Sequence, residues 1–174
     1  MILDNLLMFD PPGTPADLAQ VVGTYYSGNI LDLHMAGIPV LANLQGARDM
    51  GIGDKPALKM LVQVSTLFTS AGAATLQVAL QGAPDNGSGA PGSYAQWWLS
   101  PAFALATLAV VGARLYDMDM PRPPAGIAIP RFLRMAYIIA GATTTAGAII
   151  SGIVIDRDDQ PYSSTGNAVQ GGYP

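Results

Sequence analysis

An apolar stretch near the end of the chain constrains the fold more strongly than any other feature. Residues 131–156 read RFLRMAYIIAGATTTAGAIISGIVID, and no charged residue lies between Met135 and Ile155. A run of about 20 apolar residues is long enough to cross a bilayer as a helix. The same run can also form two buried strands joined by a turn. These two structures belong to different classes of protein, so the choice between them governs the interpretation of the whole sequence.

The composition of this stretch favours two strands. Its centre, GATTTAG at 141–147, places three threonines between two glycines, which is typical of a turn and poorly suited to the middle of a membrane. The halves on either side are rich in β-branched residues. Two arginines precede the stretch and an acidic cluster follows it, with one arginine inside that cluster. We therefore expect a pair of neighbouring core strands, buried on both faces, as in a sandwich or jelly roll, with a membrane span as the less favoured alternative.

The chain is poor in charge. It has 174 residues, half of them apolar, which fits one domain with a sizeable core. Only 11% of the residues are charged, whereas about a quarter is usual. Either partners or further copies of the chain cover much of the surface, or the surface is built from uncharged polar residues, as in many β-rich proteins. Composition leaves both explanations open.

Composition also disfavours several classes of function. The net charge is −4 and no basic cluster is present, so direct nucleic-acid binding is disfavoured. The absence of cysteine rules out a disulfide framework and a cysteine zinc site. The first residues contain Asp4 and Asp10 and no basic segment, so we expect no signal peptide and synthesis inside the cell.

Alternating apolar and polar residues predict further strands. Residues 58–68 and 75–81 alternate with a period of two and are separated by a turn at 70–72, which predicts a β-hairpin. Residues 83–93 predict a flexible loop. The adjacent Trp97 and Trp98 then follow on a strand, where neighbouring side chains point to opposite faces. We expect one indole in the core and the other exposed or at an interface.

The remaining segments give weaker signals. Residues 14–57 are predicted to be irregular, apart from one helical turn that begins at Thr14 and a short strand at 29–33. A further strand is expected from Ala109 to Met118. The segment from 120 to 130 is rich in proline, so it is expected to be a surface connection.

These elements predict an all-β protein. We expect one jelly-roll-like sandwich or barrel at 14–159, an N-terminal arm at 1–13 and a polar, glycine-rich C-terminal tail at 160–174. The early apolar segment either docks as an edge strand or reaches to a partner. The tail is expected to be disordered alone or to become ordered on a partner.

No catalytic, cofactor or metal site is predicted. The single histidine, His34, has Asp32 nearby, but no nucleophile-elbow pattern accompanies it. The acidic cluster at 156–159 lacks the glycine and glutamate of a helical calcium loop. The glycines at 51 and 53 lack the third glycine of a dinucleotide fingerprint. We therefore expect no enzymatic activity.

Two arginines are candidates for ion pairs. Arg131 and Arg134 lie three residues apart, so on a strand they would face opposite sides. Together with Arg48 and Asp49 they are candidates for structural ion pairs. They either carry charge in water at the start of a strand or form pairs between subunits.

Several short motifs, taken in their order along the chain, resemble one known family. They are Met1-Ile2-Leu3-Asp4, then residues 29–33 (NILDL), 47–53 (ARDMGIG), 71–78 (AGAATLQV) and 131–137 (RFLRMAY), and finally the strand that ends at Asp156. In this order they resemble the capsid cement (decoration) proteins of short-tailed bacteriophages. The chain departs from the family pattern at the segment 34–46, at the loop and tryptophan pair at 83–98, and in the tail after Asp159.

The resemblance implies a jelly-roll-like protein on the exterior of the virion capsid, made in the cytoplasm of the host bacterium. It implies binding to the outside of the shell of major capsid protein, where the protein would bridge capsomers as a homodimer or, alternatively, a trimer. It also implies the absence of enzymatic activity and of a cofactor, with no direct contact to nucleic acid or membrane. The head would thereby be reinforced against the pressure of packaged DNA.

Contacts with the capsid are expected in residues 1–13, 34–53 and 160–174. The residues expected at the capsid or subunit interface are Met1, Ile2, Leu3, Leu6, Phe9, His34, Ile38, Arg48, Trp97, Trp98, Arg131, Arg134, Tyr162 and Tyr173. Two alternatives remain. One is another phage component, such as a tail or carbohydrate-binding module that uses the two tryptophans as stacking platforms, and the other is a small membrane protein.

Overall fold

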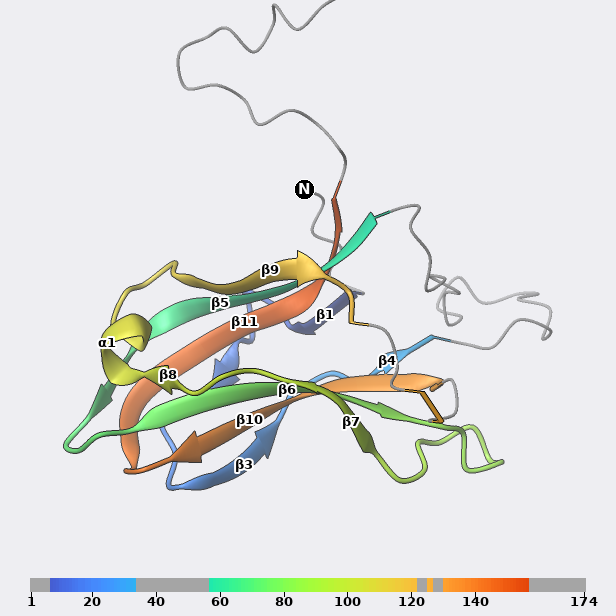
Figure 1. The fold of residues 1–174 in the computed structure, drawn as a ribbon, viewed down its shortest axis with the longest axis horizontal. Coiled ribbons are helices and arrows are strands. Elements are labelled where there is room, and N and C mark those ends of the chain that lie inside the picture. The colour runs from blue at the N-terminus through green and yellow to red at the C-terminus, as the bar shows by residue number, and fades with distance from the viewer. Residues whose placement is uncertain (1–6, 34–56, 122–124, 127–129, 157–174) are drawn as a thin grey trace, which may run out of the picture.

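The chain folds into two antiparallel β-sheets that pack face to face, one above the other in Figure 1. The computed structural model describes residues 7–33, 57–121, 125–126 and 130–156. Sheet A contains β1 (Met8–Asp10), β2 (Ala16–Asp17), β5 (Ala57–Ser70), β9 (Arg114–Asp119) and β11 (Thr144–Asp156). Sheet B contains β3 (Gly23–Tyr26), β4 (Leu31–Asp32), β6 (Thr75–Ala83), β7 (Ala95–Leu99), β8 (Phe103–Ala104) and β10 (Phe132–Ala140). The helix α1 (Leu105–Leu108) follows β8.

The strand order is that of a jelly roll. Sheet A runs β1-β11-β5-β9 and sheet B runs β3-β10-β6-β7, with β2, β4 and β8 as short additions. Strands from the C-terminal part of the chain therefore lie between strands from its N-terminal part. β11 lies between β1 and β5, and β10 lies between β3 and β6. This double Greek-key arrangement confirms the predicted all-β, jelly-roll-like sandwich. The predicted loop arm at 34–53 and the tail at 160–174 lie outside the described residues.

Alternate side chains of the long strands fill the core between the sheets. On β6 the predicted inner face, Leu76, Val78 and Leu80, is at most 1% exposed. The largest fully buried side chains are Tyr137, Phe9, Phe68, Met8, Leu18, Met60, Leu76, Leu80, Leu108, Leu133, Met135 and Ile139. Burying one such apolar side chain contributes about 1.5–3 kcal/mol, so these buried side chains together contribute strongly to stability.

The apolar stretch at 131–156 forms two strands, as predicted. β10 ends at Ala140 and β11 begins at Thr144. The chain turns at Gly141, which has a φ of 81°. A Cβ at this position would lie 2.3 Å from the carbonyl oxygen of Ala73, so only glycine fits this turn. The prediction that these two strands are neighbours in one sheet is wrong, because β10 belongs to sheet B and β11 to sheet A.

The predicted hairpin between residues 58–68 and 75–81 is wrong. Both runs are strands, but β5 pairs with β11 and β9, whereas β6 pairs with β10, β7 and β8. The turn between them carries the chain from one sheet to the other (Figure 1). The alternation of apolar and polar residues indicates which face of a strand is buried. In a sandwich this pattern is the same whichever strand lies alongside, so it does not predict which strands pair.

The described part of the segment 14–57 is more regular than predicted. The expected helical turn at Thr14 is absent, because Ala16–Asp17 form β2 and pair with β11. β3 and β4 both pair with β10. The predicted strand at 29–33 is present as the shorter β4. The strand predicted from Ala109 begins only at Arg114, after α1 and a turn.

The N-terminal segment is an edge strand where it is described. β1 pairs with β11, and the Phe9 side chain is fully buried. The sandwich therefore begins before residue 14, where the domain was predicted to start. Within the described residues, no helix is long and apolar enough to cross a membrane.

Candidate interaction surface

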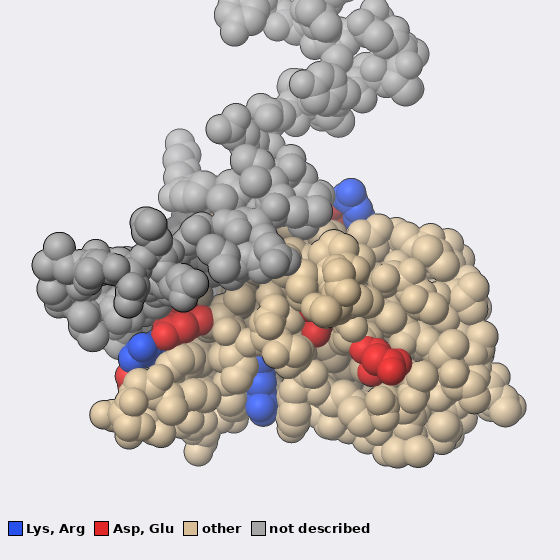
Figure 2. All heavy atoms as spheres, turned by 180° about the vertical axis from the view of Figure 1, so that it is seen from behind, with Lys and Arg blue, Asp and Glu red and all other residues tan. Residues whose placement is uncertain are grey.

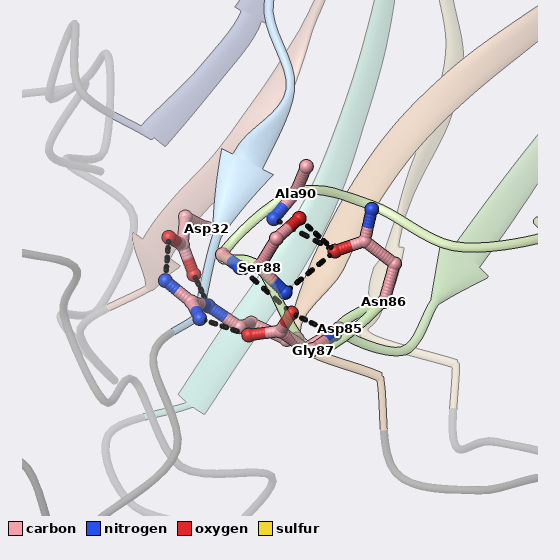
Figure 3. Close-up of polar contacts among 8 residues, drawn as sticks. Asp32, Asp85, Asn86, Gly87, Ser88 and Ala90 are labelled. Carbon is pink, nitrogen blue, oxygen red and sulfur yellow. Dashed lines mark hydrogen bonds and ion pairs between the residues drawn. The ribbon is translucent and has the colours of Figure 1, made fainter.

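Arg131 joins three segments at one end of sheet B. Its Nε and Nη2 atoms each donate a hydrogen bond of 2.9 Å to the carboxylate of Asp32, and its Nη1 atom donates to Asp85 (Figure 3). One side chain therefore joins the start of β10 to β4 and to the loop after β6. A bidentate pair is the strongest arrangement of an arginine and a carboxylate. Instead of a charge in water or a contact between subunits, Arg131 forms ion pairs within the chain.

The loop after β6 is held by hydrogen bonds from its own backbone (Figure 3). The Oδ1 atom of Asp85 accepts the amides of Gly87 at 2.8 Å and Gly89 at 3.0 Å. The Oδ1 atom of Asn86 accepts the amide of Ser88 at 2.9 Å. The two glycine amides, and then Arg131, hold the pKa of Asp85 below its ordinary value. Asp85 therefore joins the loop, which was predicted to be flexible, to the ion pairs of Arg131, Asp32 and Asp85, hereafter the Arg131 cluster.

Arg134 is held between two aromatic rings on the outer face of sheet B. Its guanidinium carbon lies 3.7 Å from the ring centroid of Tyr26 and 3.6 Å from that of Tyr94. Its Nε atom donates a hydrogen bond of 2.8 Å to Gln81, the residue directly opposite on β6. Residues opposite each other on antiparallel strands point to the same side, so this contact follows from the register. Within the described residues, no carboxylate pairs with Arg134.

The hydroxyl of Tyr94 makes no hydrogen bond to a described residue, although it is buried. Burial raises the pKa of Tyr94, and the positive charge of Arg134 acts in the opposite direction. The Tyr94 side chain is therefore uncharged, and the guanidinium of Arg134 packs against its ring.

Charged residues are few in sheet B, where the short strand β4 contributes Asp32, the partner of Arg131. The four main strands of the sheet, β3, β10, β6 and β7, contain one charged residue, Arg134. The outer face also carries exposed or partly exposed apolar side chains, since Tyr26 is 51% exposed and Leu99 is 39% exposed. In sheet A, by contrast, β9 alone contributes Arg114, Asp117 and Asp119. Seen from behind, the described surface is mostly uncharged, with a few separate charged groups (Figure 2).

Both tryptophans pack on the core. Trp97 is 8% exposed and lies against Gly82, where a Cβ would come within 2.6 Å of the indole. Trp98 is half-buried and meets Tyr116 edge-on, with ring centroids 4.5 Å apart. The register between β6 and β7 shifts after Leu80, which interrupts strict alternation. The prediction that the two indoles point to opposite faces is wrong, because both pack on the core. Neither ring is an exposed platform for a sugar.

The other predicted interface residues are either buried or not described. Phe9 is a core residue and presents no side-chain surface. Nine residues lie outside the described part of the chain: Met1, Ile2, Leu3, Leu6, His34, Ile38, Arg48, Tyr162 and Tyr173. Their expected contacts stay predictions.

A buried polar cluster was not foreseen from the sequence. Asp10 accepts hydrogen bonds from the hydroxyls of Tyr137 and Ser151 and from the amide of Gly28. The three side chains are at most 1% exposed. Asp10 stands in an Asp-Pro-Pro-Gly turn signal and Ser151 in an apolar run, so no local pattern marks them as partners. Because Asp10 and Ser151 belong to sheet A and Tyr137 to sheet B, the cluster links the two sheets, and its buried polar groups are hydrogen-bonded.

The described ranges contain no group of three or more histidine, cysteine, aspartate or glutamate side chains placed to hold a metal ion. The outer face of sheet B presents one oriented cation, Arg134, and the four main strands of the sheet contain no other charged residue.

Comparison with known proteins places the chain in a family. The family model Bbp16 matches residues 16–153. No curated protein matches the chain. The family match is compatible with a structural protein of a bacteriophage. Because the matched region runs from β2 nearly to the end of β11, and so covers well over half of the sequence, the chain belongs to the Bbp16 family.

Proposed function

We propose that this chain is a capsid cement (decoration) protein of a bacteriophage. It binds the outer surface of the major capsid protein shell, bridges neighbouring capsomers and stabilises the DNA-filled head. The observation that carries the proposal is a jelly-roll sandwich with one nearly uncharged sheet face in a member of the Bbp16 family. The resemblance of the sequence motifs to capsid cement proteins points the same way.

The chemistry of such a protein is the burial of non-covalent interfaces. Protein interfaces are depleted in charged residues at their centre and enriched in tyrosine and arginine. The outer face of sheet B has this composition, with Tyr26 and Arg134 in one contact. Many copies acting on one shell make modest individual contacts sufficient, because each bridging copy binds through more than one site. In this proposal the protein uses no cofactor, catalyses no reaction and does not contact the packaged DNA.

A rigid scaffold suits this role. The Arg131 cluster ties the loop after β6 to β4 and β10, and the Asp10 cluster joins the two sheets inside the core. A preorganised surface loses little conformational entropy on binding, so more of the interaction free energy appears as affinity. The partners in the proposal are the major capsid protein and further copies of the chain, as a dimer or trimer, on the exterior of the virion.

The proposal is tested with heads that lack this protein. Purified chain is added to DNA-filled heads from a phage in which its gene is deleted, and free and bound protein are separated by sedimentation. We expect saturable binding and a higher temperature of DNA release from the decorated heads. Absence of binding at micromolar concentrations, with folded protein and intact heads, would contradict the proposal.

A further inference from the structure

We propose that Arg134 is the central contact for an acidic side chain of the major capsid protein, which docks on the outer face of sheet B. This inference rests on the proposed function and adds the surface and the chemistry of the contact. Three features carry it: the orientation of the guanidinium, the absence of a carboxylate partner for Arg134 among the described residues, and the absence of a second charged residue in the four main strands of the sheet.

The guanidinium is oriented before any partner arrives. The rings of Tyr26 and Tyr94 pack against the guanidinium from two sides, and the Oε1 atom of Gln81 accepts a hydrogen bond from its Nε–H group. The terminal Nη1 and Nη2 atoms make no hydrogen bond within the described residues. They form the fork that accepts a carboxylate in bidentate geometry. An arginine held in this way loses less side-chain entropy on binding than a freely rotating one.

The charge of Arg134 requires a complementary group. On the free protein, water solvates the cation. When a partner covers the face, an unpaired buried charge strongly opposes binding, so the partner must supply an anion. A protein surface supplies this anion as aspartate or glutamate. A nucleic acid is a poor fit, because binding to its phosphates depends on several cations and the four main strands of this sheet carry one.

A second copy of the chain is also a poor fit for this face. In a two-fold dimer, the same patch meets itself. A dimer centred on sheet B would bring two Arg134 side chains together, and the four main strands hold no acidic residue to neutralise them. The neighbouring Asp32 and Asp85 already pair with Arg131. The face therefore suits a different protein that carries a carboxylate.

The test compares two arginine substitutions of equal charge. Arg134→Gln removes the proposed contact, whereas Arg114→Gln removes an exposed arginine of sheet A that pairs with Asp117 at 2.7 Å. Binding of each labelled chain to undecorated heads is measured at several salt concentrations. We expect Arg134→Gln to weaken binding about 30-fold or more, the effect of an interface hot spot, and Arg114→Gln to change it less than about threefold. The affinity of the Arg134 variant should also depend less steeply on salt.

A conservative variant separates recognition from folding. Arg134→Lys keeps the charge but loses the planar fork and its packing between the rings. We expect wild-type circular dichroism and a loss of affinity of about fivefold or more. Thermal melting is measured for Arg134→Gln, Arg134→Lys and the control Arg114→Gln, so that a loss of binding is counted only for folded protein.

The outcomes distinguish this inference from the proposed function. If the wild-type chain does not bind heads, the proposed function fails and the inference with it. If the wild type binds and Arg134→Gln binds as tightly as Arg114→Gln, the inference alone is overturned. If the substitution instead changes self-association of the free chain in sedimentation velocity and leaves head binding unchanged, the occupant of the face is a second copy, and the inference is also overturned.

Discussion

The Tyr137 hydroxyl, from the middle of β10, donates a hydrogen bond to the Asp10 carboxylate at the end of β1, inside the core. This contact joins sheet B to sheet A between residues 127 positions apart in the sequence. Ser151 of β11 donates to the same carboxylate oxygen at 2.9 Å. A buried carboxylate is tolerated only with such donors, so the cluster specifies how the two sheets are placed against each other.

Replacing Tyr137 by phenylalanine should destabilise the fold. The substitution keeps the ring but leaves the buried Asp10 carboxylate with one donor fewer. We expect the free energy of unfolding to fall by about 1–3 kcal/mol, measured by urea denaturation. Tyr25→Phe is the matched control, because the Tyr25 hydroxyl bonds to the Val21 carbonyl in an exposed position. Equal stabilities of the two variants would show that the buried hydroxyl has no special role.

The same residue predicts a loss of stability in alkali. Burial, followed by the charge of Asp10, raises the pKa of Tyr137 well above its ordinary value. In the unfolded chain the phenol ionises near pH 10, whereas the folded chain keeps the proton to higher pH. The stabilising contribution is therefore complete below about pH 10 and is lost as the pH rises further. The stability of wild type relative to Tyr137→Phe should fall above this pH, and a difference that stays constant would contradict this assignment.

Asp85 should have the opposite dependence on pH. Its pKa is lowered, first by the amides of Gly87 and Gly89 and then by Arg131, so its contribution is present above the ordinary carboxyl pKa near 4 and is lost as the pH falls. Asp85→Asn should therefore lower the melting temperature at pH 7, by an amount that shrinks below about pH 4. Asp117→Asn, at an exposed pair on β9, serves as the control and should have little effect at pH 7.

Phe9 should be essential for stability. Its side chain is fully buried, so Phe9→Ala should reduce the free energy of unfolding by about 3–5 kcal/mol. Val110→Ala, at a side chain that is 57% exposed, should change it by less than about 0.5 kcal/mol. Thermal melting would refute the core role of Phe9 if the two variants behaved alike. A truncation that tests capsid contacts of the N-terminal segment should accordingly end at residue 6, because removal of residues 1–9 also removes core.

The sequence predicts the strands of this fold better than their pairing. Alternation in 75–81 identifies the buried face of β6, and the β-branched halves of 131–156 identify β10 and β11. Neither pattern states which strand lies alongside, and the jelly roll pairs strands that are distant in sequence. β3, with the sequence GTYY, is too short and too polar to show a period.

The candidate surface was foreseen only in part. The type and spacing of Arg131 and Arg134 predict that they are candidates for ion pairs, but they do not predict which residues are their partners. Arg131 meets Asp32 and Asp85, which lie 99 and 46 residues away in the sequence. Such contacts depend on the register of strands and the path of loops, which local patterns do not encode.

The most direct test of the proposed cement function is the composition of purified DNA-filled heads. Heads from a wild-type infection are separated on a density gradient, and the amounts of this chain and of the major capsid protein are measured by quantitative mass spectrometry. We expect the chain to be present at a fixed ratio to the major capsid subunit, unchanged between preparations. Heads that contain none of the chain, or traces that vary between preparations, would contradict the proposed function.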